Sequence, residues 1–351
     1  MHAVLALLLG LLCACSQRND PAETLADYNA RLSRLLDSEA PPAAATRVPT
    51  WPMPQEALPV PAEVRFDLFG FPDAGRCGLL QEISESDDGM MRSRSPAQQL
   101  LQQMRLLRGL AQCAELTAGD LQGADVTRRA FAAAVRDALA QKRRDLPLFY
   151  WYSTFGSAEF REFFSVGVVP LRIGENTPAA DAANAVSWLA ALGRLRPEAP
   201  LPAAEAMDQH YYRLVGNKLG GRVWLSVDLA MRELDRASTL LEETSPERWC
   251  PGGVPGETAE RLHDLYAAYY VKRLQPWLAT TERSADMLAD ALERLWEAQQ
   301  VGVPPEIARY RRSVWADEYG SLVRDYDLAI QRHARAWQAL LAPCGLTLSA
   351  R

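Results

Sequence analysis

Apolar residues recur every three or four positions through most of this chain, which is the spacing of one face of a helix. The first such series follows Asp20-Pro21 and includes Leu25 and Leu32. Aspartate is a favoured helix cap, and proline is favoured at the first helical position. The pattern therefore predicts a helix over residues 21–39. Later series predict helices over residues 95–113, 126–144, 178–195, 202–214, 223–242, 257–275, 277–300 and 313–341.

The predicted helices indicate an all-α fold, a multi-helix globular bundle. Residues 40–62 interrupt the helical pattern with seven prolines, and proline fixes φ and lacks a backbone donor. We expect this N-terminal segment to be extended and to pack across the bundle, with a solvated linker as the alternative. Residues 64–68 could form one short strand. The remainder, residues 63–351, is expected to form a single helical domain.

Three glycine or proline positions are expected to interrupt the helical pattern in the second half of the chain. Gly220-Gly221 predicts a break before the helix at 223–242, and Pro276 predicts an interruption before residue 277. The last helix is expected to cover residues 313–341 without a break, with one core stripe that includes Trp315, Tyr319 and Leu340.

Composition and charge exclude one class of partner. The chain has 351 residues, is 48% hydrophobic and 23% charged, and carries a formal net charge of −6. Those values are ordinary for a folded globular protein. The 38 basic and 44 acidic residues are mixed along the chain. No basic block or stripe indicates a nucleic-acid partner.

The N-terminus carries the sharpest signal. Residues 4–12 form an apolar run that is too short to span a bilayer but has the length of a signal-peptide core. The run ends in Leu12-Cys13-Ala14-Cys15, which resembles the bacterial lipobox. We expect residues 1–14 to be a cleaved signal peptide and Cys15 to carry a diacylglycerol and further acyl chains such as palmitate. A buried N-terminal helix is the alternative.

This interpretation places the protein in the bacterial envelope. Residues 15–39 would form the anchor and the first helix. Ser16 follows the modified cysteine and favours the outer over the inner membrane under the bacterial sorting rule. The protein would then face the periplasm, attached to the membrane through its N-terminal lipid.

Four further cysteines are expected to form two disulfides, because an even number in an oxidising compartment is typical of a disulfide framework. Three pairings are possible. We favour Cys77–Cys113, which would close a two-helix hairpin, and Cys250–Cys344, which would tie a Pro/Gly loop to the end of the last helix. A reactive or metal-binding thiol is the alternative.

Histidines and charged groups offer little catalytic chemistry. Glu260 and His263 form an E-x-x-H motif on a predicted helix, but a di-metal bundle needs two such motifs. His263 is better interpreted as a hydrogen-bonded boundary residue, and His333 as a satisfied core histidine. Residues 208–213, which include His210, have an amphipathic pattern. No motif of a hydrolase, a phosphate loop or a dinucleotide site occurs, so we name no catalytic residue, metal ligand or cofactor.

Aromatic and basic clusters are candidate interaction surfaces. The run at residues 148–155 is the densest aromatic segment, and its Trp151, Tyr152 and Phe155 either pack in the core or form a surface for a partner or a glycan. The basic clusters at residues 142–144 and 309–312 are interpreted as solvated faces, with lipid headgroups or anionic cell wall as the alternative contact.

Several of these stretches together resemble a family of bacterial lipoproteins catalogued as domain of unknown function 3080. The likeness covers most of the mature chain, from the lipobox at Cys15 to the cysteine at 344. It includes the first helix, the proline-rich segment leading to Cys77, the helix ending at Cys113 and the aromatic segment 151–164. The resemblance implies a lipoprotein and carries no catalytic residues with it.

Two functions remain open from the sequence. The first is a lipid-anchored envelope protein that acts as a non-catalytic binding or scaffold module for an envelope protein or a cell-wall component. The second is a hydrolase of cell-envelope material, because paired carboxylates such as Asp317 with Glu318 or Glu242 with Glu243 need no recognisable motif. The clear anchor and the missing catalytic motifs favour the first.

Overall fold

The structure is a computed structural model that describes residues 19–52, 58, 75, 77–79, 95–123, 125–195, 199–216 and 218–348. The predicted signal peptide, the cysteine at position 15 and the short strand at residues 64–68 lie outside the described residues. So does most of the proline-rich segment beyond residue 52.

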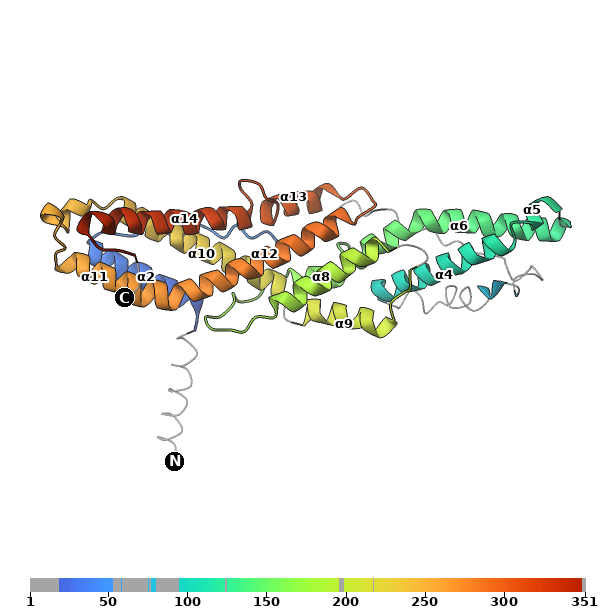
Figure 1. Cartoon of the computed structure of the whole chain (residues 1–351), viewed down its shortest axis with the longest axis horizontal. Coiled ribbons are helices and arrows are strands. Elements are labelled where there is room, and N and C mark those ends of the chain that lie inside the picture. The colour runs from blue at the N-terminus through green and yellow to red at the C-terminus, as the bar shows by residue number, and fades with distance from the viewer. Residues whose placement is uncertain are drawn as a thin grey trace, which may run out of the picture.

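The described part of the chain is all-α, as predicted, and no strand is assigned within it (Figure 1). One element, η6, is a π-helix. The α-helices are α2 (Pro21–Leu36), α4 (Pro96–Leu116), α5 (Asp120–Gly123), α6 (Val126–Ser153), α7 (Ala158–Phe163), α8 (Ala179–Gly193), α9 (Ala204–Val215), α10 (Leu219–Glu242), α11 (Glu257–Leu265), α12 (Gln275–Glu297), α13 (Pro305–Val314) and α14 (Leu322–Leu341). The short elements are the 3-10 turns η4 (Pro246–Arg248), η5 (Pro251–Gly253) and η7 (Ala342–Cys344), together with the π-helix η6 (Tyr266–Leu274).

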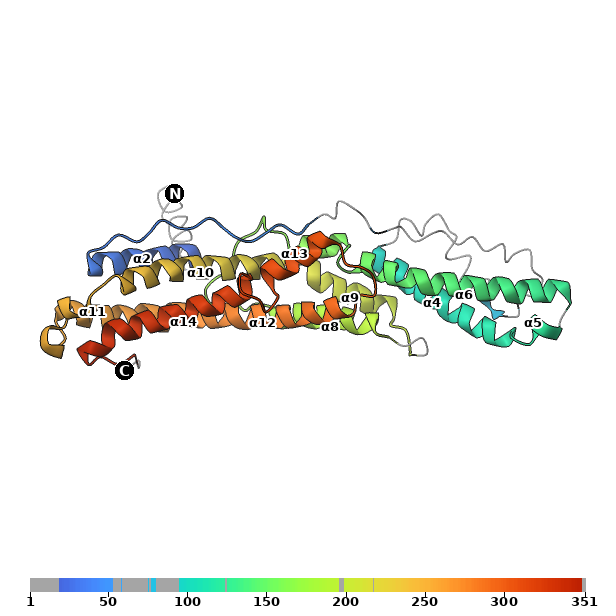
Figure 2. The same ribbon diagram turned by 90° about the horizontal axis from the view of Figure 1, so that it is seen from above.

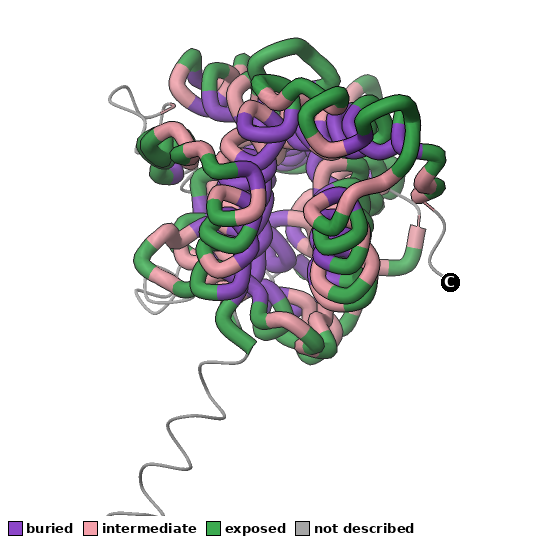
Figure 3. The backbone as a smooth tube through the Cα atoms, turned by 90° about the vertical axis from the view of Figure 1, so that its left-hand side faces the viewer, coloured by how far each residue is buried: buried purple, intermediate pink, exposed green. Residues whose placement is uncertain are grey.

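The helices form an elongated molecule with a bundle at one end and a hairpin at the other (Figures 1 and 2). In the bundle, α10 packs against both α14 and α2, while α12 packs against α8. The hairpin is made of α4 and α6. Viewed along the long axis, the buried residues face the centre of the bundle (Figure 3). Burial of apolar surface between these helices is the main force that stabilises the fold.

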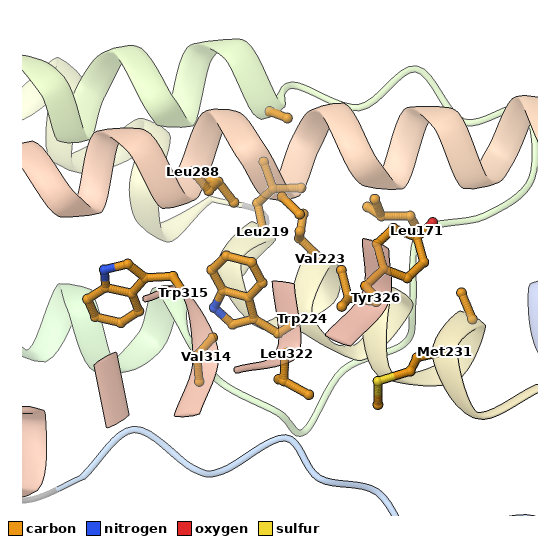
Figure 4. Packing of buried hydrophobic residues seen from close by; sticks show 14 of the residues in the cluster. Leu171, Leu219, Val223, Trp224, Met231, Leu288, Val314, Trp315, Leu322 and Tyr326 are labelled. Atoms are coloured by element: carbon orange, nitrogen blue, oxygen red, sulfur yellow. The ribbon is translucent and has the colours of Figure 1, made fainter. Parts of the chain in front are cut away.

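Most buried apolar residues of the described chain belong to two clusters. The larger one runs through the bundle and includes Trp224, Val223 and Tyr326 (Figure 4). The smaller one lies within the hairpin and includes Leu110 and Phe131. The inner turns of α4 and α6 belong to the larger cluster, so the hairpin is continuous with the bundle core.

Local sequence explains where the first helices begin. Asp20 caps α2, and its Oδ1 accepts a hydrogen bond from the Ala22 N–H at 2.8 Å. Ser95 caps α4 in the same way through the Gln98 N–H. In both helices proline follows the cap, where its missing N–H costs nothing.

The first part of the proline-rich segment lies along α10, as expected for a packed strap (Figure 2). Arg236 donates to the Pro41 carbonyl at 2.7 Å, and the Arg47 N–H donates to Asp228 at 2.9 Å. At its end, Trp51 is buried and its ring stacks on Phe164 with 4.6 Å between centroids. Residues 40–52 therefore pack across the bundle as extended chain.

The predicted last helix is wrong, because residues 315–321 separate α13 from α14. Within this connection Gly320 has a φ of 93°, a left-handed conformation that a continuous helix does not contain. Ser321 then caps α14 by accepting a hydrogen bond from the Arg324 N–H at 3.3 Å. Tyr319, which was expected on the core stripe, is exposed as a result.

The predicted break before the helix at 223–242 is present, but it lies between Val215 and Leu219, and Gly220 and Gly221 fall in the first turn of α10. A Cβ at Gly221 would lie 1.9 Å from the Ser165 carbonyl oxygen. Glycine is used here because the backbone of another segment approaches the helix closely.

Pro276 does not interrupt the helix, contrary to expectation, since α11, η6 and α12 follow one another without a gap. A proline ring clashes with the carbonyl four residues earlier in an α-helix and removes one hydrogen bond. In η6 the hydrogen bonds instead span five residues, as in the bond from the Gln275 N–H to the Tyr270 carbonyl. This wider turn accommodates the proline that follows it.

Both disulfides are present with the favoured pairing. Cys77 is joined to Cys113 beside α4 of the hairpin, and Cys250 is joined to Cys344. The second bond connects the loop before α11 to the turn after α14. Closing chain segments of 36 and 94 residues restricts the unfolded chain and so stabilises the folded state.

Candidate functional site

A pocket of about 300 Å³ lies between the loop that joins α7 to α8 and the junction of η6 with α12. Its floor is apolar and its rim is basic. The lining residues are Leu171, Arg172, Ile173, Gly174, Glu175, Thr177, Lys272, Arg273, Pro276, Trp277 and Thr280.

The loop side of the pocket is fixed to α10 by an ion pair and to α12 by a hydrogen bond. The Arg222 guanidinium binds both carboxylate oxygens of Glu175, at 2.8 and 2.7 Å. The Leu171 N–H donates to the Ser226 hydroxyl at 2.8 Å, and the indole of Trp277 donates to the Leu171 carbonyl at 2.9 Å. The Leu171 side chain is buried in the bundle core (Figure 4). The wall is therefore held in place from both sides.

The first described residues lie against this same loop (Figure 1). The Ile173 N–H donates to the Asn19 carbonyl at 3.0 Å, immediately before Asp20 caps α2. Asn19 itself is exposed. The chain therefore enters the bundle beside the pocket.

Positive charge dominates the rim. Arg172 and Lys272 are exposed, and neither side chain forms an ion pair with another described residue. Arg273 contacts α2 and η6, since it donates to the Thr24 hydroxyl at 3.4 Å and lies over the Tyr269 ring at 5.2 Å.

The one carboxylate among the lining residues is neutralised by its partner. Partial burial raises the pKa of Glu175, but hydrogen bonds from the Arg222 guanidinium and from the Arg172 N–H outweigh that effect and hold the pKa below its ordinary value. Glu175 is thus an ionised, bound partner of Arg222. The pocket can attract an anion, whereas proton exchange through Glu175 would require breaking its bidentate ion pair.

Of the two interpretations of the aromatic segment, core packing holds for Trp151 and Phe155, which corrects their assignment to a possible partner surface. Trp151 and Phe155 are each only 1% exposed. Phe155 lies between the Trp51 and Phe160 rings, with centroids 5.9 and 5.7 Å away. Tyr152 is half-buried and donates to the Leu58 carbonyl. These rings fill the bundle because large apolar side chains gain most free energy when they leave water.

The histidines occupy the structural roles that were expected. His333 is fully buried and contacts the hydroxyls of Tyr28 and Ser238 at 2.9 and 3.2 Å. His263 bonds to the Thr347 carbonyl at 3.1 Å. His210 stacks on the Trp188 ring, with 4.2 Å between centroids.

Each basic cluster differs at one residue from the expected solvated face. Lys142 is buried in the hairpin, where it donates to the Gln103 side chain at 2.8 Å. Arg311 binds both carboxylate oxygens of Glu293, at 2.9 and 2.7 Å. Arg309 is exposed as predicted.

Sequence reasoning missed the pocket. Its two walls come from residues 171–177 and 272–280, which are far apart in the chain and contain no known motif. The available signal in the sequence is the pair of cations Lys272 and Arg273 shortly before Pro276-Trp277, and by itself it does not indicate a pocket.

Two further findings concern the described residues alone. None of their helices combines the length and the apolar composition needed to cross a bilayer. No group of three or more metal-binding side chains gathers in this part of the chain.

Comparison with known proteins assigns the chain to a family. A family model described as "Protein of unknown function (DUF3080)" matches residues 25–348. No curated protein and no solved structure matches the chain. Since the family model covers nearly all of the sequence, the protein belongs to the DUF3080 family of proteins of unknown function.

Proposed function

We propose that this protein is a lipid-anchored module of the bacterial cell envelope, attached through Cys15 to the periplasmic face of the outer membrane. The observation that carries the proposal is the lipobox-like sequence Leu12-Cys13-Ala14-Cys15. The hydrogen bond between Ile173 and Asn19 adds that the chain enters the bundle beside the pocket. Asn19 is four positions after Cys15, and an extended chain spans at most about 3.5 Å per residue. The lipid would therefore begin within about 14 Å of Asn19.

Such an anchor would hold the pocket close to the membrane surface. The lipobox-like sequence ending at Cys15 supports the anchor. The disulfides Cys77–Cys113 and Cys250–Cys344 support an oxidising compartment, because such bonds are rare in a reducing cytosol.

The pocket supports binding as the role of the module. Its floor is apolar, its rim is basic, and its carboxylate is held by Arg222. General acid–base catalysis needs a group that can exchange a proton near the substrate. Among the lining residues, Glu175 is the acid present and its ion pair opposes that role. An envelope protein, a cell-wall component or the membrane itself are the partners that fit this location.

The anchor is tested by comparing Cys15→Ser with the matched control Cys13→Ser. We expect the wild type and Cys13→Ser to remain in the membrane fraction after a high-salt wash, with a mass that lacks residues 1–14 and includes a diacylglycerol. Cys15→Ser should lack that lipid. A native protein that retains Met1 or an unmodified Cys15 would contradict the proposal.

The binding role is tested in intact cells with a photo-reactive amino acid at the pocket. Thr280 lines the pocket, whereas Arg309 is an exposed position on α13 that serves as the control. We expect crosslinks to one envelope component from position 280 and not from position 309. Turnover of purified cell-envelope material by the isolated protein would instead support the hydrolase alternative.

A further inference from the structure

We infer that the pocket between the 171–177 loop and η6 binds the phosphate group of an anionic lipid, with the adjoining carbons of the lipid on its apolar floor. This inference rests on the proposed function, because it names the ligand of the same site. Four features of the pocket carry it.

The first feature is unneutralised positive charge. Arg172 and Lys272 line the rim, are exposed and form no side-chain ion pair within the described part of the chain. Phosphate oxygens are strong acceptors for guanidinium and ammonium groups. The nearby carboxylate does not oppose an anion strongly, because the Arg222 guanidinium already neutralises Glu175.

The second feature is the apolar floor under that rim. Ile173 and Pro276 are the apolar lining residues that keep accessible surface, whereas Leu171 and Trp277 are almost fully buried. The Trp277 N–H is already bonded to the Leu171 carbonyl, so it offers no donor to a ligand. Such a floor suits hydrocarbon, whereas a site for a free inorganic anion would gain nothing from it.

The third feature is an unsatisfied hydroxyl in the wall. The Thr177 Oγ1 atom is buried and has no hydrogen-bond partner among the described residues. A buried polar atom without a partner costs free energy. Thr177 is one of the lining residues, so a ligand oxygen that accepted a hydrogen bond from this hydroxyl would remove that cost.

The fourth feature is the position of the chain entry. Asn19 contacts Ile173 in the pocket wall, so a lipid on Cys15 would bring the rim to the headgroup layer. Cations near an anionic membrane surface are attracted to it over about one Debye length. The site is thus located where phospholipid phosphates are concentrated.

The experiment measures lipid binding by native mass spectrometry of the full-length protein in a neutral detergent. Dihexanoyl phosphatidylglycerol supplies phosphate, negative charge and carbon chains. Dihexanoyl phosphatidylcholine has the same chains without net charge, and sn-glycerol 3-phosphate has the phosphate without chains. We expect saturable binding of the first probe and at least about tenfold weaker binding of the other two.

The matched variants are Lys272→Gln and Arg172→Gln, with Arg309→Gln as the control on a distant exposed face. We expect each pocket variant to weaken phosphatidylglycerol binding about tenfold, and the control to bind like the wild type. Circular dichroism of each variant checks that the fold is kept. Equal binding by all four proteins, or equal affinity for sn-glycerol 3-phosphate, would overturn the inference.

This outcome is separable from that of the proposed function. A protein that carries lipid on Cys15 but does not bind phosphatidylglycerol would disprove the pocket ligand alone. A protein that binds phosphatidylglycerol but has an unmodified Cys15 would disprove the anchor alone.

Discussion

The Tyr28 hydroxyl lies 2.9 Å from Nε2 of His333, which links the first described helix to the last. The Ser238 hydroxyl donates to the Leu234 carbonyl at 2.7 Å, so it accepts a hydrogen bond from His333 Nδ1–H. Nε2 is then the acceptor for the Tyr28 hydroxyl. The Trp337 indole donates to the Tyr28 oxygen at 2.8 Å and completes the network. Three helices thus share one buried polar cluster.

Removing the hydroxyl of Tyr28 tests this network. Tyr28→Phe leaves the Trp337 N–H with only the longer contact to His333, at 3.1 Å. We expect the free energy of unfolding to fall by about 1–2 kcal/mol, the cost of a lost buried hydrogen bond. Urea denaturation under non-reducing conditions measures this change. Tyr212→Phe is the control, because Tyr212 is 78% exposed and should change stability by less than about 0.5 kcal/mol.

The buried histidine should make stability depend on pH. Burial, and secondarily the charge of Arg332, lower the pKa of His333 from 6.5 to about 3. Between these values the unfolded chain binds a proton that the folded protein does not. Stability should therefore decrease as the pH falls from about 6.5 towards 3, by up to about 1.4 kcal/mol per pH unit from this group. His333→Gln should remove that part of the slope. Equal slopes in both proteins would contradict this assignment.

Asp286 should contribute to the pH dependence of stability with a sign opposite to that of His333. Partial burial, followed by the charges of Asp327, Glu282 and Asp290, raises its pKa from 3.8 to about 6. The folded protein binds a proton here that the unfolded chain releases, so this group lowers stability as the pH rises from about 3.8 to 6. Asp286→Asn should raise the melting temperature at pH 7.5.

The size of the Asp286 effect is limited because the residue is largely exposed and solvent screens its neighbours. We expect a gain below about 1 kcal/mol at pH 7.5 that decreases in 0.5 M NaCl, since salt screens exposed charges. Calorimetry at both salt concentrations measures it. An Asn variant that melts lower than the wild type at pH 7.5 would refute the repulsion.

Gly221 allows α10 to approach the loop that builds the pocket. Gly221→Ala would place a carbon against the Ser165 carbonyl, so one of the two backbones must move. We expect a loss of about 1–3 kcal/mol or more, as for an overpacked core. Gly302→Ala is the control, because nothing lies within 4 Å of a Cβ there. Thermal unfolding of both variants separates close packing from the general effect of replacing glycine.

Local chemistry made part of the fold predictable. The cap at Asp20 acts within three residues, so it is visible in the sequence and was placed correctly. Ser95 likewise stands at the start of the helix predicted over residues 95–113. Helix periodicity also identified the fold class. The disulfide between Cys250 and Cys344 followed from two loop signals that flank helices.

Long-range packing accounts for the parts that were not predictable. Glycine is needed at position 221 of α10 because the backbone of Ser165, which is distant in the sequence, approaches the helix closely. Pro276 is tolerated because the preceding turn widens, and the sequence alone does not indicate that change of hydrogen-bond register. For the aromatic segment at 148–155, both the core and the surface interpretation stay open until the helices that cover it are placed. The pocket was not predictable for the same reason, because its two walls come from segments that are far apart in the sequence.

The contact between Tyr28 and His333 has a consequence for the timing of folding. The two residues are 305 positions apart, so the polar cluster that they share cannot form until α14 has been synthesised. Contacts at such separation form slowly, because the ends of a long chain must first find each other. The nascent protein would therefore expose the apolar side of its earliest helix for most of its synthesis. During that period the exposed surface is prone to aggregation, and a chaperone that covered it would have its largest effect.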